Sequence, residues 1–413
     1  MKQTLLVILW GLIATVGLAQ SADHSDEFHL DSNQHHSIAV AGSYFFASTA
    51  ITNGLASDYY LHRFIENSTK DEVGNKLQRS NCFGTGFNGS ITYLYRPDSC
   101  KYHYIFTLQQ NFFATSEFRD DVFDLYFRGN KGFAGDTAYV DHSDFRSIQY
   151  YQTGIGVSGT CQAGRTEWYA IGNFFLGHDF LDIKTGNGYL YTSPDGEYID
   201  ADLDITFRAS DSTAVQPGAV NGTGFGLTAG FSTTLSSHTR IHAGVTNLGF
   251  IHFFERSSYA QLDSTLRFEG LDATELFDFS DTVTSTIIND SAIVQQFLSN
   301  RSKEGFNVWV PGHFDLSLDR ELNSSLTLSI GTRQYFAYHA VPIGWLEASY
   351  RLYNHHTIRL HTQYGGFTAW SAGIGYQLNY QGWELSISSN YLSAWMSRNG
   401  RSQGAFVSLS KSF

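Results

Sequence analysis

The sequence predicts an all-β protein, a transmembrane up-and-down antiparallel β-barrel of about 14 strands, within a range of about 12 to 16. Three observations predict it: segments that alternate apolar and polar residues, connections that alternate between short and long, and a last strand that ends on an aromatic residue. After Gln20 no apolar run reaches the ~18 residues of a membrane-spanning helix. Because only helices and closed barrels satisfy their backbone in lipid, an exported chain of this kind is either a barrel or a soluble secreted protein.

The N-terminus predicts that export. Lys2 gives a positive start, the apolar run Leu5–Leu18 follows, and Gly17 and Ala19 are the small residues that a signal peptidase needs. We therefore expect a signal peptide over residues 1–19, with an N-terminal anchor as the alternative. The cell outer membrane is then the expected location.

The composition favours the barrel over a secreted sandwich, although a large sandwich can share it. The 413 residues include 24 Tyr and 33 Phe but only 5 Pro. Aromatic girdles at both membrane interfaces account for such a composition. The net charge of −13 argues against a general nucleic-acid binder, which needs basic patches.

Fourteen segments have the alternation of amphipathic strands. They are 38–47, 82–95, 102–114, 147–160, 166–178, 224–235, 239–250, 312–319, 325–336, 343–352, 356–364, 367–378, 383–394 and 403–413. In 383–394, one face carries Trp383, Leu385, Ile387 and Tyr391, and the other is polar. We expect the apolar face of each strand to meet lipid and the polar face to line the lumen.

The connections alternate in length, as they do between periplasmic turns and external loops. The short ones are Arg96–Lys101, Cys161–Arg165, Ser236–His238, Arg320–Ser324, Tyr353–His355 and Asn379–Gly382. The long, acidic ones are 48–81, 115–146, 179–223 and 251–311, with shorter members at 337–342, 365–366 and 395–402. Residues 20–413 are therefore expected to form a single barrel domain. Tyr189–Arg208 and Ser257–Phe268 are candidates for strand extensions or an extra pair, and Ala292–Ser299 for a short helix.

The last strand, Arg401–Phe413, is predicted to close the barrel. Ala405, Val407 and Leu409 alternate with polar neighbours, and the strand stops on the aromatic Phe413, as outer-membrane barrels do. Lys411 interrupts the apolar face, but near the periplasmic end its ammonium can reach the headgroups.

Particular stretches carry a family resemblance. The segment Asp121–Thr137 resembles a stretch of a family of Bacteroidota outer-membrane proteins of unknown function, and Val245–Phe254, Leu266–Gly270 and Ala50–Lys76 are similar to other parts of that family. The likeness runs over nearly the whole mature chain. It implies a barrel distantly like the fourteen-stranded long-chain fatty-acid transporter class, and it implies no catalytic residues. That class begins with an Asn-Pro-Ala element, whereas residues 49–54 here read Thr-Ala-Ile-Thr-Asn-Gly.

The polar faces of the last strands supply the first candidate site. The predicted lumen-lining residues are Arg333, Glu347, Arg351, Arg359, His361 and Glu384. Arg333, Arg351 and Arg359 fall on three consecutive strands, so one hypothesis is a single cationic patch that biases a pore toward anionic solutes. The alternative is that these arginines pair with Glu347, Glu384 or acidic loops.

A second, weaker candidate is a calcium site at Asp200, Asp202 and Asp204, which share one strand face roughly 6–7 Å apart. The alternative is a solvated acidic face. Otherwise we expect no metal, no cofactor and no catalytic residues, because the chain has no G-x-S-x-G and no P-loop motif. The chain has three cysteines, Cys82, Cys100 and Cys161. An odd number is compatible either with isolated thiols or with one disulfide-bonded pair.

Three functions are compatible with these residues. The first is passage of a small or amphipathic, fatty-acid-like solute, which predicts a lateral opening or kinked strand with an apolar pocket beneath the outer loops. The second is a non-transporting barrel that docks a surface or periplasmic protein in secretion, gliding or adhesion, which predicts a plugged lumen. The third is an outer-membrane hydrolase, which predicts a Ser/His/acid cluster at one rim.

Overall fold

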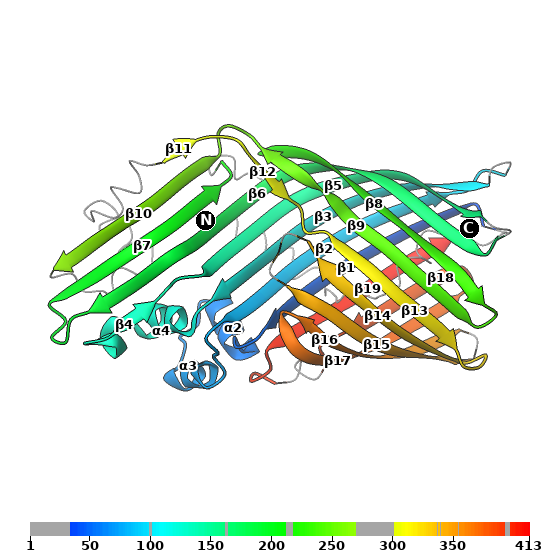
Figure 1. The fold of residues 1–413 in the computed structure, drawn as a ribbon. Coiled ribbons are helices and arrows are strands. Elements are labelled where there is room, and N and C mark those ends of the chain that lie inside the picture. The colour runs from blue at the N-terminus through cyan, green and yellow to red at the C-terminus, as the bar shows by residue number, and fades with distance from the viewer. Residues whose placement is uncertain are drawn as a thin grey trace.

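Fourteen strands close into an antiparallel barrel in this computed structural model (Figure 1). They are β1 His36–Ser48, β2 Asn81–Tyr95, β3 Tyr102–Phe118, β5 Ser143–Cys161, β6 Thr166–Thr192, β8 Gly222–Ser236, β9 Thr239–Phe253, β13 His313–Glu321, β14 Leu326–Tyr335, β15 Val341–Leu352, β16 His356–Gly366, β17 Thr368–Tyr380, β18 Trp383–Ser389 and β19 Ser402–Ser412. Each pairs with the barrel strand before and after it, and β1 pairs with β19. The predicted fold class and all fourteen predicted strands are confirmed.

The structure describes residues 34–98, 101–161, 164–211, 218–269, 301–336, 338, 340–353, 355–392 and 397–413. The predicted signal peptide, the predicted helix Ala292–Ser299 and Cys100 lie outside the described residues and stay predictions. No helix in the described parts of the chain is long and apolar enough to cross a membrane.

The two faces of the strands have opposite character, as the alternation predicts. On β3, Phe106 and Leu108 are exposed on the outside of the barrel, whereas Thr107 is buried on the inside. The outside of the barrel therefore presents an apolar surface of the kind that barrels turn toward lipid. Other exposed members of this surface include Val40, Ile155, Phe225, Ile330, Leu360, Trp370 and Ile387.

Tyr391 corrects one of the predicted faces. The alternation placed Tyr391 on the lipid side with Trp383 and Ile387, but β18 ends at Ser389 and Tyr391 lies in a turn. Its ring packs inside the barrel against a buried apolar cluster. The prediction was wrong because the two-residue period holds only while the backbone stays extended.

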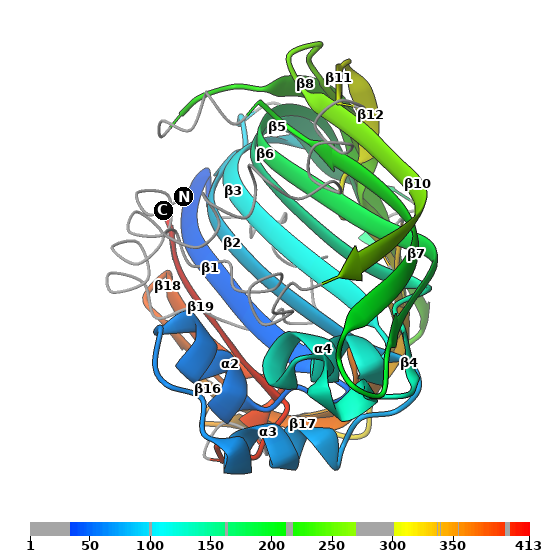
Figure 2. The same cartoon turned by 90° about the vertical axis from the view of Figure 1, so that its left-hand side faces the viewer.

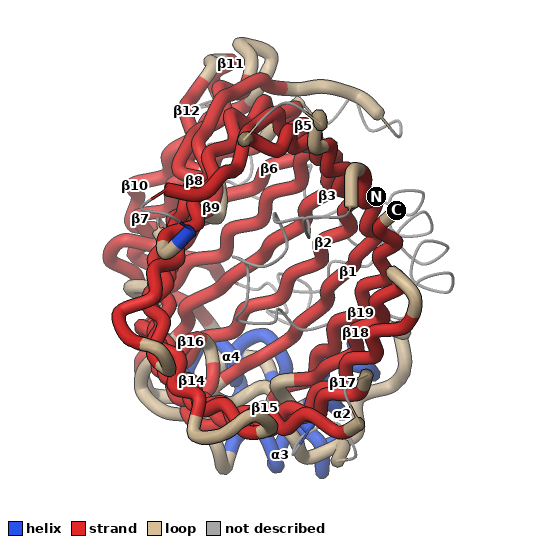
Figure 3. Tube along the Cα trace, turned by 90° about the vertical axis from the view of Figure 1, so that its right-hand side faces the viewer, coloured by secondary structure: helices blue, strands red, loops and turns tan. Residues whose placement is uncertain are grey.

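At one end of the barrel the strands are joined by short turns (Figure 3). Tyr380 pairs with Trp383, so only Gln381 and Gly382 form that connection, both with positive φ, as in a type I′ hairpin turn. The ammonium of Lys411 donates to the carbonyl oxygen of Gln381 at 2.8 Å and lies over the Trp383 ring. We call this the turn end and the opposite one the loop end.

The loop end carries the remaining elements (Figure 2). They are α2 Asn53–Tyr60, α3 Asn67–Gly74, α4 Asp120–Arg128, the 3₁₀ helix Asn130–Phe133, β4 Thr137–Tyr139, β7 Tyr198–Ala209, β10 Ser258–Glu269, β11 Ser302–Lys303 and β12 Phe306–Trp309. The three α-helices share a small core around Leu55, Val73 and Phe123.

β6 continues well past the barrel wall, and β7 and β10 pair beside its extension (Figure 1). These strands form a sheet that projects beyond the loop end, and β4 pairs with the other edge of the β6 extension. The sequence-based expectation of extra strands at Tyr189–Arg208 and Ser257–Phe268 is thereby confirmed.

Candidate functional site

A polar cavity of about 940 Å³ occupies the barrel lumen. It begins among residues of the turn end, such as Thr357 and Ser412, and reaches inward to Phe45 and Phe113 near the loop end. Small-molecule sites in proteins have volumes of about 300–1,000 Å³, so this cavity is large enough for a small solute.

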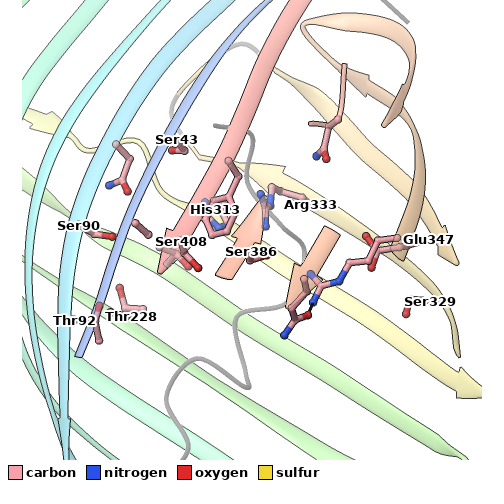
Figure 4. Close-up of a pocket in the computed structure, with 18 of the residues that line it drawn as sticks. Ser43, Ser90, Thr92, Thr228, His313, Ser329, Arg333, Glu347, Ser386 and Ser408 are labelled. Atoms are coloured by element: carbon pink, nitrogen blue, oxygen red, sulfur yellow. Dashed lines mark hydrogen bonds between the residues drawn. The ribbon is translucent and has the colours of Figure 1, made fainter. Parts of the chain in front are cut away.

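One wall of the cavity, formed by β18, β19, β1 and β2, carries many small hydroxyl side chains. Its hydroxyl residues include Ser37, Ser43, Ser90, Thr92, Ser386, Ser408 and Ser410. Figure 4 shows Ser90 and Thr92 on one side of the cavity and Arg333 and Glu347 on the other.

The facing wall carries ion pairs from β9 and β13–β16. The Arg333 guanidinium donates to Asp315 at 2.6 Å, and His313 lies 3.0 Å from the same carboxylate. Toward the turn end, His242 and Asp319 approach to 2.7 Å. Most of the charge on this wall is therefore compensated by a neighbour.

Five of the six predicted lumen-lining residues line the cavity: Arg333, Glu347, Arg351, Arg359 and Glu384. The sixth, His361, points inward but is covered, because its ring stacks on Trp345 and its Nδ1 lies 3.6 Å from Glu347. The role of these residues in selectivity stays a prediction.

The strand register separates the three arginines of the hypothetical patch. Arg333 pairs with Ile343, and Arg351 lies eight residues further along β15, or about 26 Å away at ~3.3 Å per residue. Arg359 lies close to Arg351 and donates to Gln377, which in turn donates to Glu384 at 2.9 Å. The hypothesis of a single cationic patch is therefore wrong, because residues on consecutive strands can lie at different heights in the barrel. Arg333 does pair with an acid, but that acid is Asp315.

Packed apolar side chains close the loop end of the lumen. Their buried members are Ala47, Phe113, Ile148, Tyr150, Phe175, Phe180, Ile251, Phe253, Val308, Val310, Tyr338 and Phe367. We call this cluster the plug. Tyr338 comes from the connection between β14 and β15, and Phe367 from the tip of the β16–β17 hairpin. The plug is thus built partly from loop residues and partly from the barrel wall.

Phe367 enters the lumen because of the two glycines before it. Gly365 and Gly366 have φ values of 108° and 73°, a backbone region that favours glycine. The Phe367 ring then stacks on Phe45 with centroids 6.2 Å apart. It also lies over Gly84, where an added Cβ would come within 2.3 Å of the ring. The hairpin tip therefore fits only against a bare glycine backbone.

Outside the plug, Asp182 on the β6 extension holds two arginines. Arg146 donates to it at 3.0 Å, and Arg208 also donates to it. Burial raises the pKa of Asp182, but the hydrogen bonds and charges of Arg146 and Arg208 lower it more, so this pKa lies below its usual value. We call these three residues the Asp182 cluster.

A known family covers nearly all of this barrel. Its sequence model matches residues 32–390, from the residues before β1 to the end of β18. The chain belongs to the family of unknown function DUF5723. This confirms the predicted likeness to a family of unknown function, while the organism group that the likeness implies stays a prediction. No curated protein matches the chain.

Solved structures similar to this DUF5723 chain have about the same length, since each match covers about nine-tenths of both chains. The Ralstonia pickettii toluene transporter TbuX shares 10% identity, with a TM-score of 0.45, over 92% of this chain and 90% of that chain. A Pseudomonas aeruginosa FadL homologue shares 10% identity, with a TM-score of 0.44, over 92% and 90%. The Pseudomonas putida toluene transporter TodX shares 8% identity, with a TM-score of 0.41, over 92% and 88%. At these values the likeness carries no inference about what the DUF5723 chain binds.

The three aspartates of the calcium hypothesis lie on β7, in the projecting sheet of the DUF5723 barrel. Arg267 donates to Asp200 at 2.6 and 2.7 Å, and this hydrogen bond lowers the pKa of Asp200. Asp202 accepts from Thr265 at 3.5 Å. Among the described residues, no group of three or more His, Cys, Asp or Glu is arranged to hold a metal ion. Calcium binding by these aspartates stays a prediction.

The arrangement around Asp319 bears on the hydrolase hypothesis. A nucleophilic hydrolase needs the serine hydroxyl on the imidazole and the acid on the other side of the ring. Here both His242 and Ser329 hydrogen-bond to the Asp319 carboxylate. The serine therefore lies on the acid rather than on the base. Cys82 and Cys161, elsewhere in the barrel, are free thiols.

Sequence reasoning did not single out the carboxamides on the inner faces of β2, β3, β5 and β6, nor the aromatic residues of the plug. The alternation does place Gln109 and Asn111 on the polar face of 102–114, so the same period could have found the carboxamides. The plug has no such signal, because Tyr338 and Phe367 come from connections.

Proposed function

We propose that this barrel is a gated passage for small polar or amphipathic solutes across the outer membrane. The observation that carries the proposal is the cavity of about 940 Å³, which reaches from the turn end to the plug. The apolar exterior of the barrel supports a place in a bilayer. The hydroxyl and charged side chains that line the cavity support a hydrated path for a solute. An amphipathic solute would meet charge along the cavity and aromatic rings at its end.

Two residues make the plug a reasonable gate. Tyr338 and Phe367 are buried, yet both lie in connections rather than in the barrel strands. The Phe113 ring meets Tyr338 edge-on with centroids 5.0 Å apart, and Phe113 also packs on Phe367. A movement of either connection would withdraw an aromatic ring from the plug without breaking a strand pair of the barrel.

The test is conductance in planar lipid bilayers. We expect the wild-type barrel to be mostly closed, and Phe367→Ala and Tyr338→Ala to raise its conductance several-fold. Trp370→Ala is the matched control, because Trp370 follows Phe367 on β17 but is exposed on the outside. If Phe367→Ala and Tyr338→Ala fold, as judged by their heat-dependent gel migration, and conduct no better than Trp370→Ala, the passage is refuted.

The second candidate is a barrel that docks a protein partner and transports nothing. The plug favours it, as does a group of exposed apolar residues at the loop end: Tyr59 and Leu61 at the end of α2, and Phe64, which is 80% exposed. This candidate predicts that Phe367→Ala leaves conductance unchanged while Phe64→Ser abolishes capture of a partner.

A further inference from the structure

A row of carboxamide side chains lines the inner end of the lumen cavity. Its members are Asn88 on β2, Gln109 and Asn111 on β3, Gln152 on β5, Asn173 on β6 and Asn247 on β9. We call these six residues the amide belt. The belt crosses the wall opposite β14–β16, and all six members line the same cavity.

The belt is partly ordered by its own hydrogen bonds. Asn88 donates to Asn111 at 2.8 Å, and Asn173 donates to Thr228 at 2.8 Å and to Asn247 at 3.3 Å. Asn247 has a φ of 54°, which few residues other than glycine adopt and asparagine tolerates better than most. The side chains of Asn88, Asn111, Asn173 and Asn247 are therefore held in place before anything binds.

Several polar atoms of the belt have no hydrogen-bond partner in the described part of the protein. They include Oε1 of Gln152, Oδ1 of Asn173, Nδ2 of Asn111 and, beside the belt, Oγ1 of Thr107. Gln152 and Asn173 are only 3% exposed. Buried polar groups in proteins are nearly always paired, so these unpaired donors and acceptors leave hydrogen-bonding capacity unused beside the cavity.

Gly154 gives this surface a notch. It lies between Thr107 and Asn173 in the register, and an added Cβ would come within 2.3 Å of Thr107 Oγ1 and 2.8 Å of Asn173 Oδ1. Both oxygens, together with the Ile171 side chain, therefore occupy the space that the missing side chain leaves.

Aromatic rings adjoin the belt. Asn111 pairs with Tyr150, and Phe113 lies two residues beyond Asn111 on the same strand face. Both rings belong to the plug and also line the cavity. A ligand on the belt would touch uncharged donors and acceptors along one side and aromatic carbon at its end.

We propose that the amide belt binds a neutral, hydroxyl-rich ligand, namely a short saccharide. A carboxamide donates and accepts, as a sugar hydroxyl does, and the apolar faces of sugar rings pack on aromatic rings. An anion has less to gain, because Asp315 already compensates Arg333, the strong cation at this height of the lumen. The inference rests on the proposed passage insofar as the saccharide is its solute, but binding can be measured without transport.

The experiment is calorimetric titration of the purified barrel in detergent with maltotriose and with N,N′-diacetylchitobiose. We expect saturable binding of at least one of them. Gln152→Leu and Asn173→Leu are expected to weaken it by about tenfold or more, since each removes one or two hydrogen bonds. Gln110→Leu is the matched control, because Gln110 lies between two belt residues on β3 and is exposed on the opposite face.

The outcomes separate clearly. Binding that falls in Gln152→Leu, returns in part in Gln152→Asn and is unchanged in Gln110→Leu supports the belt. No binding of either saccharide, or equal weakening in Gln152→Leu and Gln110→Leu with both variants folded, overturns it. If saccharide binds at the belt but Phe367→Ala does not conduct, the passage fails and the site stands. If Phe367→Ala conducts and no saccharide binds, the site fails and the passage stands.

Discussion

The guanidinium of Arg146 lies over the ring of Tyr338, 5.5 Å from its centroid. Tyr338 belongs to the plug, and Arg146 belongs to the Asp182 cluster. The other arginine of that cluster, Arg208, lies in the same way over Phe306, whose ring packs against the plug. One carboxylate on the β6 extension thus holds two cations against two rings at the loop end.

Asp182→Asn is expected to loosen the plug. The amide cannot compensate two guanidinium groups, so Arg146 and Arg208 lose the partner that fixes them over Tyr338 and Phe306. We expect the bilayer conductance of Asp182→Asn to be higher than that of the wild type, as it is expected to be for Tyr338→Ala. Asp200→Asn is the control, since it breaks the Asp200–Arg267 ion pair in the projecting sheet. Equal conductance of Asp182→Asn and wild type would show that the cluster does not act on the plug.

The Asp182 cluster also predicts a pH dependence. The pKa of Asp182 is lower in the folded protein than the usual ~3.9, so its contribution to stability is complete above pH ~4. That contribution is lost as the pH falls through the folded pKa. Conductance of the wild type should therefore rise below pH ~4 and that of Asp182→Asn should not. If the conductance of Asp182→Asn rose at low pH as much as that of the wild type, carboxylates other than Asp182 would be responsible for the rise.

Gly154→Ala tests the notch between Thr107 and Asn173. The new methyl group would overlap both side chains and Ile171, so we expect a loss of about 1–3 kcal/mol in the free energy of unfolding. Gly172→Ala is the matched control on the neighbouring strand, because its Cβ would meet only one atom, at 3.8 Å. Urea unfolding in detergent measures both, and equal stabilities would mean that the notch has more room than its geometry implies.

Arg333 and Arg351 are expected to respond differently to substitution. Arg333→Met leaves the Asp315 carboxylate without its arginine and should cost about 3–5 kcal/mol of unfolding free energy. Arg351→Met removes an exposed charge and should cost at most about 1 kcal/mol. The double variant Arg333→Met with Asp315→Leu should recover much of the first loss, and failure to do so would mean that packing rather than charge dominates there.

Arg351 and Arg359 carry what remains of the anion hypothesis. They lie near the turn end of the cavity, where a solute would enter from that side. Arg351→Ala and Arg359→Ala together should lower the anion preference of the conducting Phe367→Ala barrel, read as the reversal potential in a salt gradient. Replacing Lys411, which lies outside the cavity lining, is the control. An unchanged reversal potential would refute the hypothesis.

The fold was accessible from sequence because the barrel obeys one local rule. Alternation fixes which residues face inward, as it did for Thr107 and Gln109, and connection length fixes which end of the barrel a segment occupies. Both signals are local, so they can be recognised in the sequence without knowing which strands pair. The alternation fails at Tyr391, where the backbone leaves the extended state after Ser389.

The site was less accessible because it depends on register and on loops. No local pattern states that Arg333 lies opposite Ile343, and the height difference between Arg333 and Arg351 follows from that pairing alone. The plug depends on Tyr338 and Phe367 returning from connections into the lumen, which only the packed structure determines. The residues that line the cavity could be predicted from the sequence, but the plug that closes its inner end could not.

The seam between β1 and β19 has a consequence for assembly. The hydroxyls of Ser37 and Ser412 lie 3.1 Å apart although 375 positions separate them in the chain. Contacts so distant in sequence form late, because the chain must lose most of its freedom before they stabilise anything. Until β19 arrives, β1 presents an open edge to which other chains can add. A barrel of this kind therefore needs its last strand delivered quickly, or its first strand shielded, while it inserts into the membrane.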